Sequence, residues 1–117
     1  MTYVDAFVMP VQKNRVDDYR STIAETWALW QEFGALTYSE CVADDVPYGE
    51  VTSFPRAVQA REDETIILSW VTYPSRAVRD DANKKMMSDP RMVELMEKAP
   101  VDGRRMIFGG FEAVFEG

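Results

Sequence analysis

The sequence places three carboxylates in segments that are predicted to form β-strands and not loops: Asp5, Glu40 and Glu112. In the strand order argued below, the first and last strands are antiparallel neighbours, so Asp5 and Glu112 are expected to approach each other. Two close carboxyl groups raise the pKa of one of them, which would give an acid–base pair or a seat for a hard cation. The alternative is structural, with Arg105, Arg56 or an arginine of a second subunit neutralising the pair.

The alternation of side chains along the first strand predicts which face of the sheet Asp5 occupies. Asp5 shares a face with Tyr3, whereas Val4 and Val8 occupy the opposite face. We expect the small aliphatic side chains to pack on helices. Asp5 is therefore predicted to point away from the helices, toward the sheet of a second subunit.

Other polar and aromatic residues are weaker candidates for ligand contacts. Asn83, on a predicted helix, would hydrogen-bond a ligand at a barrel rim or satisfy nearby backbone groups. An aromatic or quinone-like ligand would be contacted by Tyr3, Tyr38, Trp70 and Tyr73, but burial in an interface explains these residues equally well. Five methionines would line an adaptable pocket, although core filling is the stronger interpretation; they are Met86, Met87, Met92, Met96 and Met106.

The sequence contains no histidine, which narrows its chemistry more than any other fact. The usual general base at neutral pH, the commonest zinc ligand and the partner of a nucleophilic Ser or Cys are all missing. Cys41, the single cysteine, has no such partner, so we do not expect it to act as a nucleophile. We assign no cofactor and no metal site, and keep a cation site built from the three carboxylates as an option.

Size and charge restrict the classes of protein and partner. A chain of 117 residues fits a single domain, 1–117. The formal net charge of −7 disfavours nucleic acid and anionic membrane surfaces as partners. The N-terminus does not resemble a secretory signal, and no apolar run approaches the ~20 residues of a membrane helix. The expected location is therefore the cytoplasm.

Hydrophobic periodicity predicts the elements that must position these residues. Strands are expected over 3–11, where Pro10 marks an end or an edge, and over 35–43. Between them, apolar residues at three- and four-residue spacing, with Tyr19 among them, predict one helix capped by Asn14 and stopped by Gly34. A loop over 44–53 is followed by a predicted hairpin of strands over 54–60 and 65–73. Two helices come next, one capped by Ser75 and a short one capped by Asp89. The last strand covers 106–115, with a bulge or a close backbone approach at Gly109-Gly110.

This order is that of an α+β ferredoxin-like βαββαβ sandwich with one extra hairpin strand. Both helices would cover the same face of the sheet. The other face would still carry large apolar side chains, and an exposed patch of several hundred Å² is uncommon on a monomer. We therefore predict a homodimer in which a second copy covers that face.

Several segments resemble one known family. The run Met86-Met87-Ser88-Asp89-Pro90-Arg91-Met92 is the most specific, and further segments of the same kind lie at 3–8, 32–36, 40–41, 44–47, 69–70 and 103–112. Together they resemble the YbaA-like bacterial family of unknown function over nearly the whole chain. The resemblance implies a dimeric α/β-barrel, in which two ferredoxin-like sheets face each other. It implies no established activity and no catalytic residues.

The leading functional hypothesis is a homodimeric small-molecule-binding protein with a cavity between sheet and helices. Fold analogy extends it to a cofactor-independent oxygenase or isomerase. In that scheme Asp5 or Glu112 is the base, Tyr3 and Asn83 orient the ligand, and Arg105 stabilises an anion or enolate.

Glu40 and Trp70 are the remaining ligand-binding candidates. The alternative hypothesis is a non-catalytic stress or interaction protein, whose sheet-face carboxylates and aromatics only hold the dimer together. The sequence leaves open whether the protein is an enzyme.

Overall fold

The computed structural model describes residues 2–117, which form one antiparallel sheet with helices on both of its sides. The sheet has four strands in the spatial order β2-β3-β1-β4. The strands are β1 (Tyr3–Gln12), β2 (Thr37–Val42), β3 (Glu64–Tyr73) and β4 (Ile107–Glu112). This is the predicted ferredoxin-like α+β fold, with the four main strands at the predicted places.

The register of β1 explains how a proline fits a central strand. β1 pairs with β3 along its whole length, from Tyr3 opposite Tyr73 to Gln12 opposite Glu64. It pairs with β4 only as far as Val8. Pro10 therefore lies where β1 has a single neighbour, so its missing N–H group is tolerated there. The strand becomes an edge at Pro10, as predicted, but continues to Gln12.

The first helical region is divided, where one helix was predicted. It comprises η1 (Lys13–Arg15), α1 (Val16–Ala24) and α2 (Trp27–Glu32). The predicted cap at Asn14 was wrong, because α1 begins after Arg15 without a side-chain cap. The break lies at Thr26, which is fully buried and donates its hydroxyl proton to the Ile23 carbonyl at 2.6 Å. A side chain that bonds the preceding turn competes with the helix, which explains the interruption.

The predicted extra hairpin strand was also wrong, because its segment forms a short helix. This helix is α3 (Phe54–Ala57). The Ser53 hydroxyl accepts the Arg56 backbone N–H at 3.2 Å, and Pro55 lies in the first turn, so the segment carries a strong helix start. Val58 follows and is fully buried, which anchors the helix on the sheet.

The remaining two helices begin where the sequence predicted. They are α4 (Arg76–Ser88) and α5 (Pro90–Lys98). Ser75 caps α4 by accepting the Val78 N–H at 3.3 Å, and Asp89 caps α5 by accepting the Arg91 N–H at 2.8 Å. None of the helices within residues 2–117 has the length and apolar character that crossing a lipid bilayer requires.

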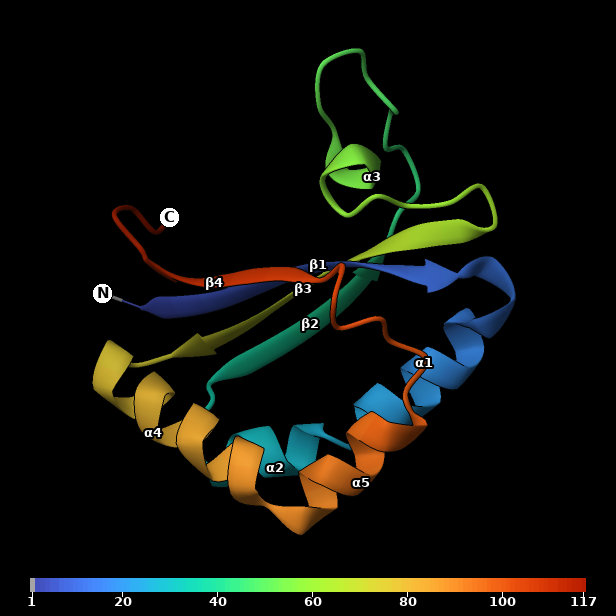
Figure 1. Ribbon diagram of the computed structural model, residues 1–117. Helices are drawn as coiled ribbons and strands as arrows, with labels where there is room; N and C mark the ends of the chain where they lie inside the picture. Colours follow the sequence, from blue (N-terminus) through green and yellow to red (C-terminus); the bar gives the residue numbers. More distant parts are fainter. Residues whose placement is uncertain (1) are drawn as a thin grey trace.

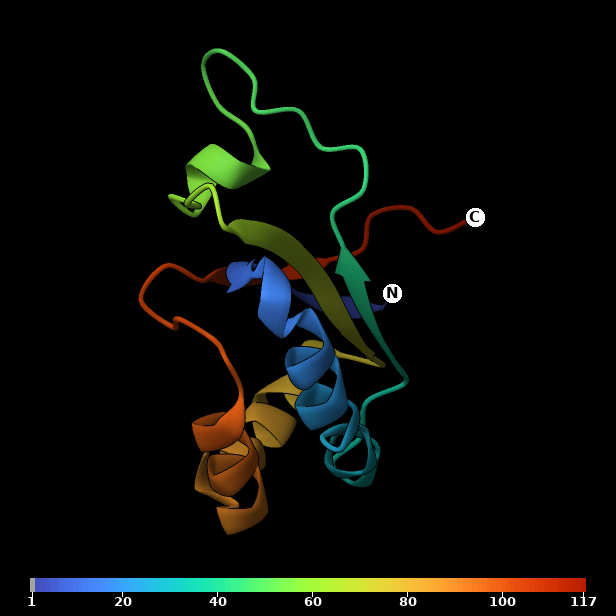
Figure 2. The same cartoon turned by 90° about the vertical axis from the view of Figure 1, so that its right-hand side faces the viewer.

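The two faces of the sheet are covered unequally. Figure 1 shows α1, α2, α4 and α5 beneath the sheet, with α3 and the loop before it above; Figure 2 shows the same separation from the side. Tyr3 and Phe7 pack on the core cluster that contains Trp30 of α2, and Asp5 lies between them on the same face. Asp5 therefore faces the helices, and the prediction that it points toward a second sheet was wrong.

The opposite face, which we call the open face, is covered only at one end. There Val58 packs with Val8 and Ile66. Further along β4, Ile107 and Phe111 are 46% and 58% exposed. The open face also carries four partly exposed apolar residues, which are Val4, Ala6, Leu68 and Trp70.

Two glycines allow close approaches that a side chain would block. Gly34 ends α2 with a φ of 113°, and a Cβ atom there would lie 2.7 Å from Cγ1 of Val78 in α4. A Cβ atom at Gly110 would lie 2.6 Å from the Tyr3 hydroxyl and would overlap the guanidinium of Arg79. The alternatives predicted at Gly109-Gly110 are thereby resolved: the β1–β4 register is continuous through both glycines, so there is a close approach and no bulge.

We expect Gly34→Ala to lower the free energy of unfolding by about 1–3 kcal/mol, because alanine is strained at that φ and its Cβ would collide with α4. Gly103→Ala is the matched control, since a Cβ there meets nothing within 4 Å and the φ is not positive. Urea unfolding of both variants measures the difference. Equal stability of the two would contradict the packing of α2 against α4.

Candidate functional site

A cavity of about 660 Å³ lies between the helix-facing side of the sheet and the helices. Its floor is the sheet, and α1, α2, α4 and α5 contribute its walls. Six of the seven methionines in the sequence line it, although core filling was the stronger interpretation of most of them; they are Met9, Met86, Met87, Met92, Met96 and Met106. Thioether side chains are flexible and polarisable, so this lining can adapt to apolar molecules of different shape.

The first polar group on the cavity floor is the carboxylate of Glu40. Its two oxygens accept hydrogen bonds from two phenols, Tyr19 of α1 at 2.9 Å and Tyr38 of β2 at 2.5 Å. Glu40 lies on an edge strand and is exposed as a residue, but these bonds hold its carboxylate among aromatic rings. Burial raises the pKa of the Glu40 carboxyl, and the bonds from Tyr38 and Tyr19 offset part of that rise.

The two phenols stay protonated donors. Burial raises the pKa of both Tyr19 and Tyr38 well above the ordinary value for tyrosine, and the negative charge of Glu40 raises it further. Both hydroxyls therefore keep their protons and donate to Glu40 at neutral pH. The carboxylate is held from two directions, by a helix and by its own strand.

The second polar group is centred on Asp5, which is 3% exposed. Arg79 donates to one carboxylate oxygen at 2.7 Å, and Asn83 donates to the other at 3.2 Å. Both donors lie on α4, four residues apart and hence on one face of the helix. Asn83 was predicted to contact a ligand or satisfy backbone, and it instead bonds a carboxylate while also lining the cavity.

Several predicted site residues lie away from this cavity. Glu112 is exposed and pairs with Tyr3 in the β1–β4 register, whereas Asp5 pairs with Gly110, so Glu112 does not lie opposite Asp5. The Asp5 carboxylate is bound by Arg79 and Asn83 in place of the expected second carboxylate. Tyr3 is on the helix-facing side of β1 but outside the cavity lining, with the Arg79 guanidinium 5.2 Å from its ring centre. Trp70 alternates onto the open face of β3, on the other side of the sheet.

Arg105 is an anchor for the chain and does not line the cavity. It forms two hydrogen bonds of 2.7 Å with Glu64 and one of 2.8 Å with Asp102, and it donates to the Gln59 carbonyl. The Arg105 guanidinium lowers the pKa of Glu64 below its ordinary value. The other arginine named for a structural role, Arg56, stacks over Tyr48 at 3.9 Å. Neither of these arginines neutralises Asp5, because Arg79 does so.

The cation option is not supported by the arrangement of acidic groups. Glu112 does not join Asp5 and Glu40, and nowhere in residues 2–117 do three His, Cys, Asp or Glu side chains gather as a metal site requires. Each of the two carboxylates on the cavity floor already has two donors. These donors occupy them with hydrogen bonds in place of a metal.

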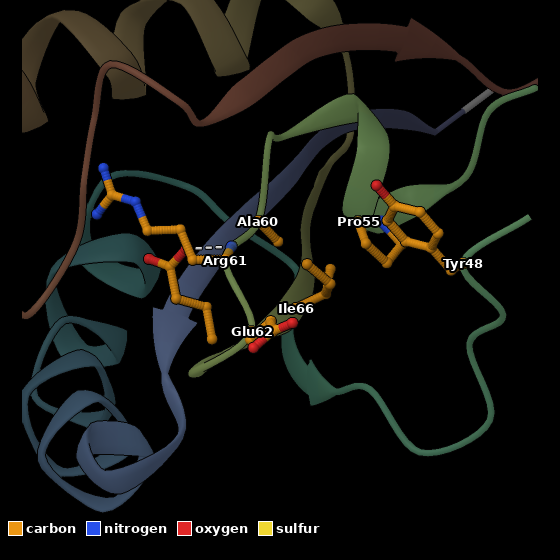
Figure 3. A pocket seen from close by; sticks show the side chains of 7 residues that line it. Tyr48, Pro55, Ala60, Arg61, Glu62 and Ile66 are labelled. Carbon is orange, nitrogen blue, oxygen red and sulfur yellow. Dashed lines mark hydrogen bonds between the residues drawn. The ribbon is translucent and has the colours of Figure 1, made fainter.

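A second hollow of about 500 Å³ lies beside α3 (Figure 3). Tyr48, Pro55, Ala60 and Ile66 form apolar walls, and Arg61 donates its backbone N–H to Glu64 at 2.7 Å. Its charged side chains are Arg61, Glu62 and Glu64, and the Glu64 carboxylate is already bound by Arg105 through two hydrogen bonds of 2.7 Å. The hollow is also smaller than the helix–sheet cavity and has fewer apolar residues around it. The helix–sheet cavity is therefore the better candidate site.

Sequence reasoning missed three residues of the site: Ser69, Tyr19 and Arg79. Ser69 left a signal, because it is the one polar residue in the otherwise apolar run Ile66–Val71. Tyr19 was assigned only to the apolar stripe of its helix. Arg79 had no signal, since only the register of α4 over the sheet brings it to Asp5.

Comparisons with known proteins agree with this architecture. Residues 2–103 match the model of the family described as "Protein of unknown function (DUF1428)". The chain is also 53% identical over 116 residues to the uncharacterised protein YbaA of Escherichia coli strain K12, and the match covers 99% of each chain. The chain belongs to this family. The resemblance predicted from the Met-Met-x-Asp-Pro-Arg-Met run is thereby confirmed.

Solved structures share the fold of this family member at low sequence identity. A dimeric ferredoxin-like protein from an uncultured marine organism superimposes with a TM-score of 0.67 at 10% identity, covering 100% of this chain and 98% of that one. A Bacillus cereus protein named as a candidate antibiotic biosynthesis monooxygenase gives 0.54 at 9% identity, covering 99% and 96%. At these identities the likeness shows the ferredoxin-like fold alone.

The raised pKa of Glu40 predicts an unusual pH dependence of stability. The folded state holds this proton more tightly than the unfolded chain, whose pKa is near the ordinary 4.5. The stability that Glu40 contributes is therefore complete below that value and is lost as pH rises through the folded-state pKa. We expect the free energy of unfolding of Glu40→Gln, relative to the unmodified protein, to increase with pH over this window.

Urea unfolding across about pH 4–8 measures this difference. Glu112→Gln is the control, because Glu112 is exposed and its replacement should change stability by less than about 0.5 kcal/mol. A relative stability of Glu40→Gln that falls with rising pH would show that the Glu40 carboxylate is not buried among the tyrosines.

Proposed function

We propose that the protein is a homodimer that binds an apolar small molecule in the helix–sheet cavity. The observation that carries this proposal is the cavity itself, which is lined by methionines and aromatics and has two polar groups on its floor. Ligand sites in proteins have this character, with volumes of about 300–1,000 Å³ and a few placed polar groups on an apolar wall.

The mouth of the cavity supports entry of an apolar molecule. Met87, Val93, Met96 and Phe108 line the cavity and are also exposed large hydrophobic residues. These side chains give an entering ligand apolar surface at the solvent-exposed part of the lining. Glu97 is an exposed acidic residue on the same lining.

Catalysis on the bound molecule, as isomerisation or oxygenation without a cofactor, is the second candidate. Glu40 favours it, because a partly buried carboxylate with a raised pKa in a cavity is suited to proton transfer. Asp5 is less suited as the base, since Arg79 and Asn83 already bind both of its oxygens. Glu112 and Arg105 lie outside the cavity lining and have no part in this scheme.

The dimer is proposed from the open face of the sheet. Phe111 and Ile107 are large, apolar and about half exposed on this face, beside partly exposed Trp70. A second copy would cover them, and a structural neighbour of this fold is described as dimeric. Asp5 and Glu40 face the helices instead, so apolar side chains, and not these carboxylates, would hold such a dimer.

The cavity can be tested with the neutral apolar fluorophore N-phenyl-1-naphthylamine. We expect the protein to bind it with an increase in fluorescence, and Ser69→Phe to weaken binding by about tenfold or more because the phenyl ring fills the floor of the cavity. Ser21→Phe, on the exposed side of α1, is the matched control and should bind normally. No binding by the unmodified protein would refute the ligand-binding function.

The dimer can be tested with two phenylalanines on opposite faces of one strand. Phe111→Glu should raise the dimer dissociation constant by about 30-fold or more, because it buries a charge in the apolar interface. Phe108→Glu, on the helix side of β4, should leave the dimer intact. Sedimentation at micromolar concentration distinguishes the two. A monomeric unmodified protein would contradict the proposed assembly.

A further inference from the structure

The floor of the cavity carries a polar row that crosses two strands. Glu40 of β2 and Ser69 of β3 are directly paired in the antiparallel register, and Ser69 is in turn paired with Phe7 of β1. Directly paired residues share a face, with Cβ atoms about 4.5–5.5 Å apart. A carboxylate, a hydroxyl and an aromatic ring therefore follow one another across the floor, all of them lining the cavity.

Ser69 is the unusual member of this row. The residue is 2% exposed and lines the cavity, and no hydrogen bond of its hydroxyl is found within the described residues 2–117. Its oxygen is not among the fully enclosed side-chain atoms without a partner in that range, which are Trp30 Nε1 and the Tyr73 hydroxyl. The Ser69 hydroxyl is therefore accessible from the cavity, where an oxygen atom of a ligand can accept the hydrogen bond that it has to donate.

Glu40 retains capacity for a ligand as well. Tyr19 and Tyr38 each donate one hydrogen bond to it, one to each carboxylate oxygen. A carboxylate has about four lone-pair sites, so about two remain. The phenols fix the orientation of the carboxylate, and the pairing with Ser69 places it beside the expected ligand oxygen.

We infer that the site takes an apolar ketone with a hydrogen on the carbon next to the carbonyl, and that Glu40 moves that proton while Ser69 holds the carbonyl oxygen. This inference rests on the proposed ligand-binding function of the same cavity. The apolar body of the ketone packs against the methionines of α4 and α5, and its oxygen lies over the Glu40–Ser69 row.

The proton transfer balances without another reactant. Glu40 takes the proton from the α-carbon, the C–H electron pair becomes the new C=C bond, and the carbonyl π pair moves onto oxygen. The Ser69 hydroxyl donates a hydrogen bond to that enolate oxygen. Glu40 then returns a proton to carbon, either to the same atom or to another end of a conjugated system, which gives an isomer.

The probe is 1-tetralone, an apolar bicyclic ketone with hydrogens next to its carbonyl. Exchange of these hydrogens for deuterium in D₂O is followed by proton NMR, and saturation-transfer NMR reports binding separately. We expect the protein to accelerate exchange over buffer. Glu40→Gln should lower the enzymatic exchange rate by about 10²-fold or more, and Ser69→Ala by about tenfold or more, with 1-tetralone still bound in both variants.

Glu112→Gln, at an exposed position outside the cavity lining, is the matched control and should exchange at the normal rate. Exchange that persists in Glu40→Gln overturns the assignment of the base. Binding of 1-tetralone without accelerated exchange, or binding of the naphthylamine probe without any of 1-tetralone, overturns the inference and leaves the binding function standing. Failure of both probes to bind removes both proposals.

Discussion

The burial of one charge in the middle of the sheet governs how the helix layer sits. Asp5 is almost fully buried on the central strand β1, and a buried carboxylate without partners would destabilise the fold by several kcal/mol. Arg79 and Asn83 provide those partners from successive turns of α4, which fixes that helix in rotation and along its axis. Gly110 belongs to the same arrangement, because any side chain there would occupy the space of the Arg79 guanidinium.

With α4 fixed in this way, a cavity remains between the helices and the helix-facing side of the sheet. Thioethers and aromatic rings, which can pack against ligands of many shapes, are prominent in its walls. Its floor holds two carboxylates that have different hydrogen-bond partners. Asp5 is neutralised by a guanidinium and serves the fold. Glu40 accepts hydrogen bonds only from two phenols, and burial raises its pKa. The two environments suit Asp5 to a structural role and Glu40 to the proposed functional one.

The two faces of the sheet differ in character. The helix side carries every polar group of the candidate site, and the open side carries Phe111, Ile107 and Trp70, which the proposed dimer would cover. Alternation along β4 divides them: Phe108 lies toward the cavity mouth and Phe111 toward the open face. A partner on the open face would stiffen the cavity floor from behind without contributing to its lining.

Local patterns in the sequence determined the ferredoxin-like order, the family, the caps at Ser75 and Asp89 and the end of a helix at Gly34, because caps, turns and periodicity depend on neighbouring residues. Two predictions from periodicity were wrong. The segment after Ser53 is a helix and not a strand, because Ser53 and Pro55 form a strong helix start. The first helix is divided into α1 and α2, because the buried Thr26 hydroxyl bonds the preceding turn. The prediction that Asp5 faces away from the helices was also wrong. Alternation separates the two faces of a strand, but only tertiary contacts with Arg79 and Asn83 decide which face meets the helices. The same long-range register brings Glu40, Ser69 and Tyr19 together, since these residues lie on three different elements.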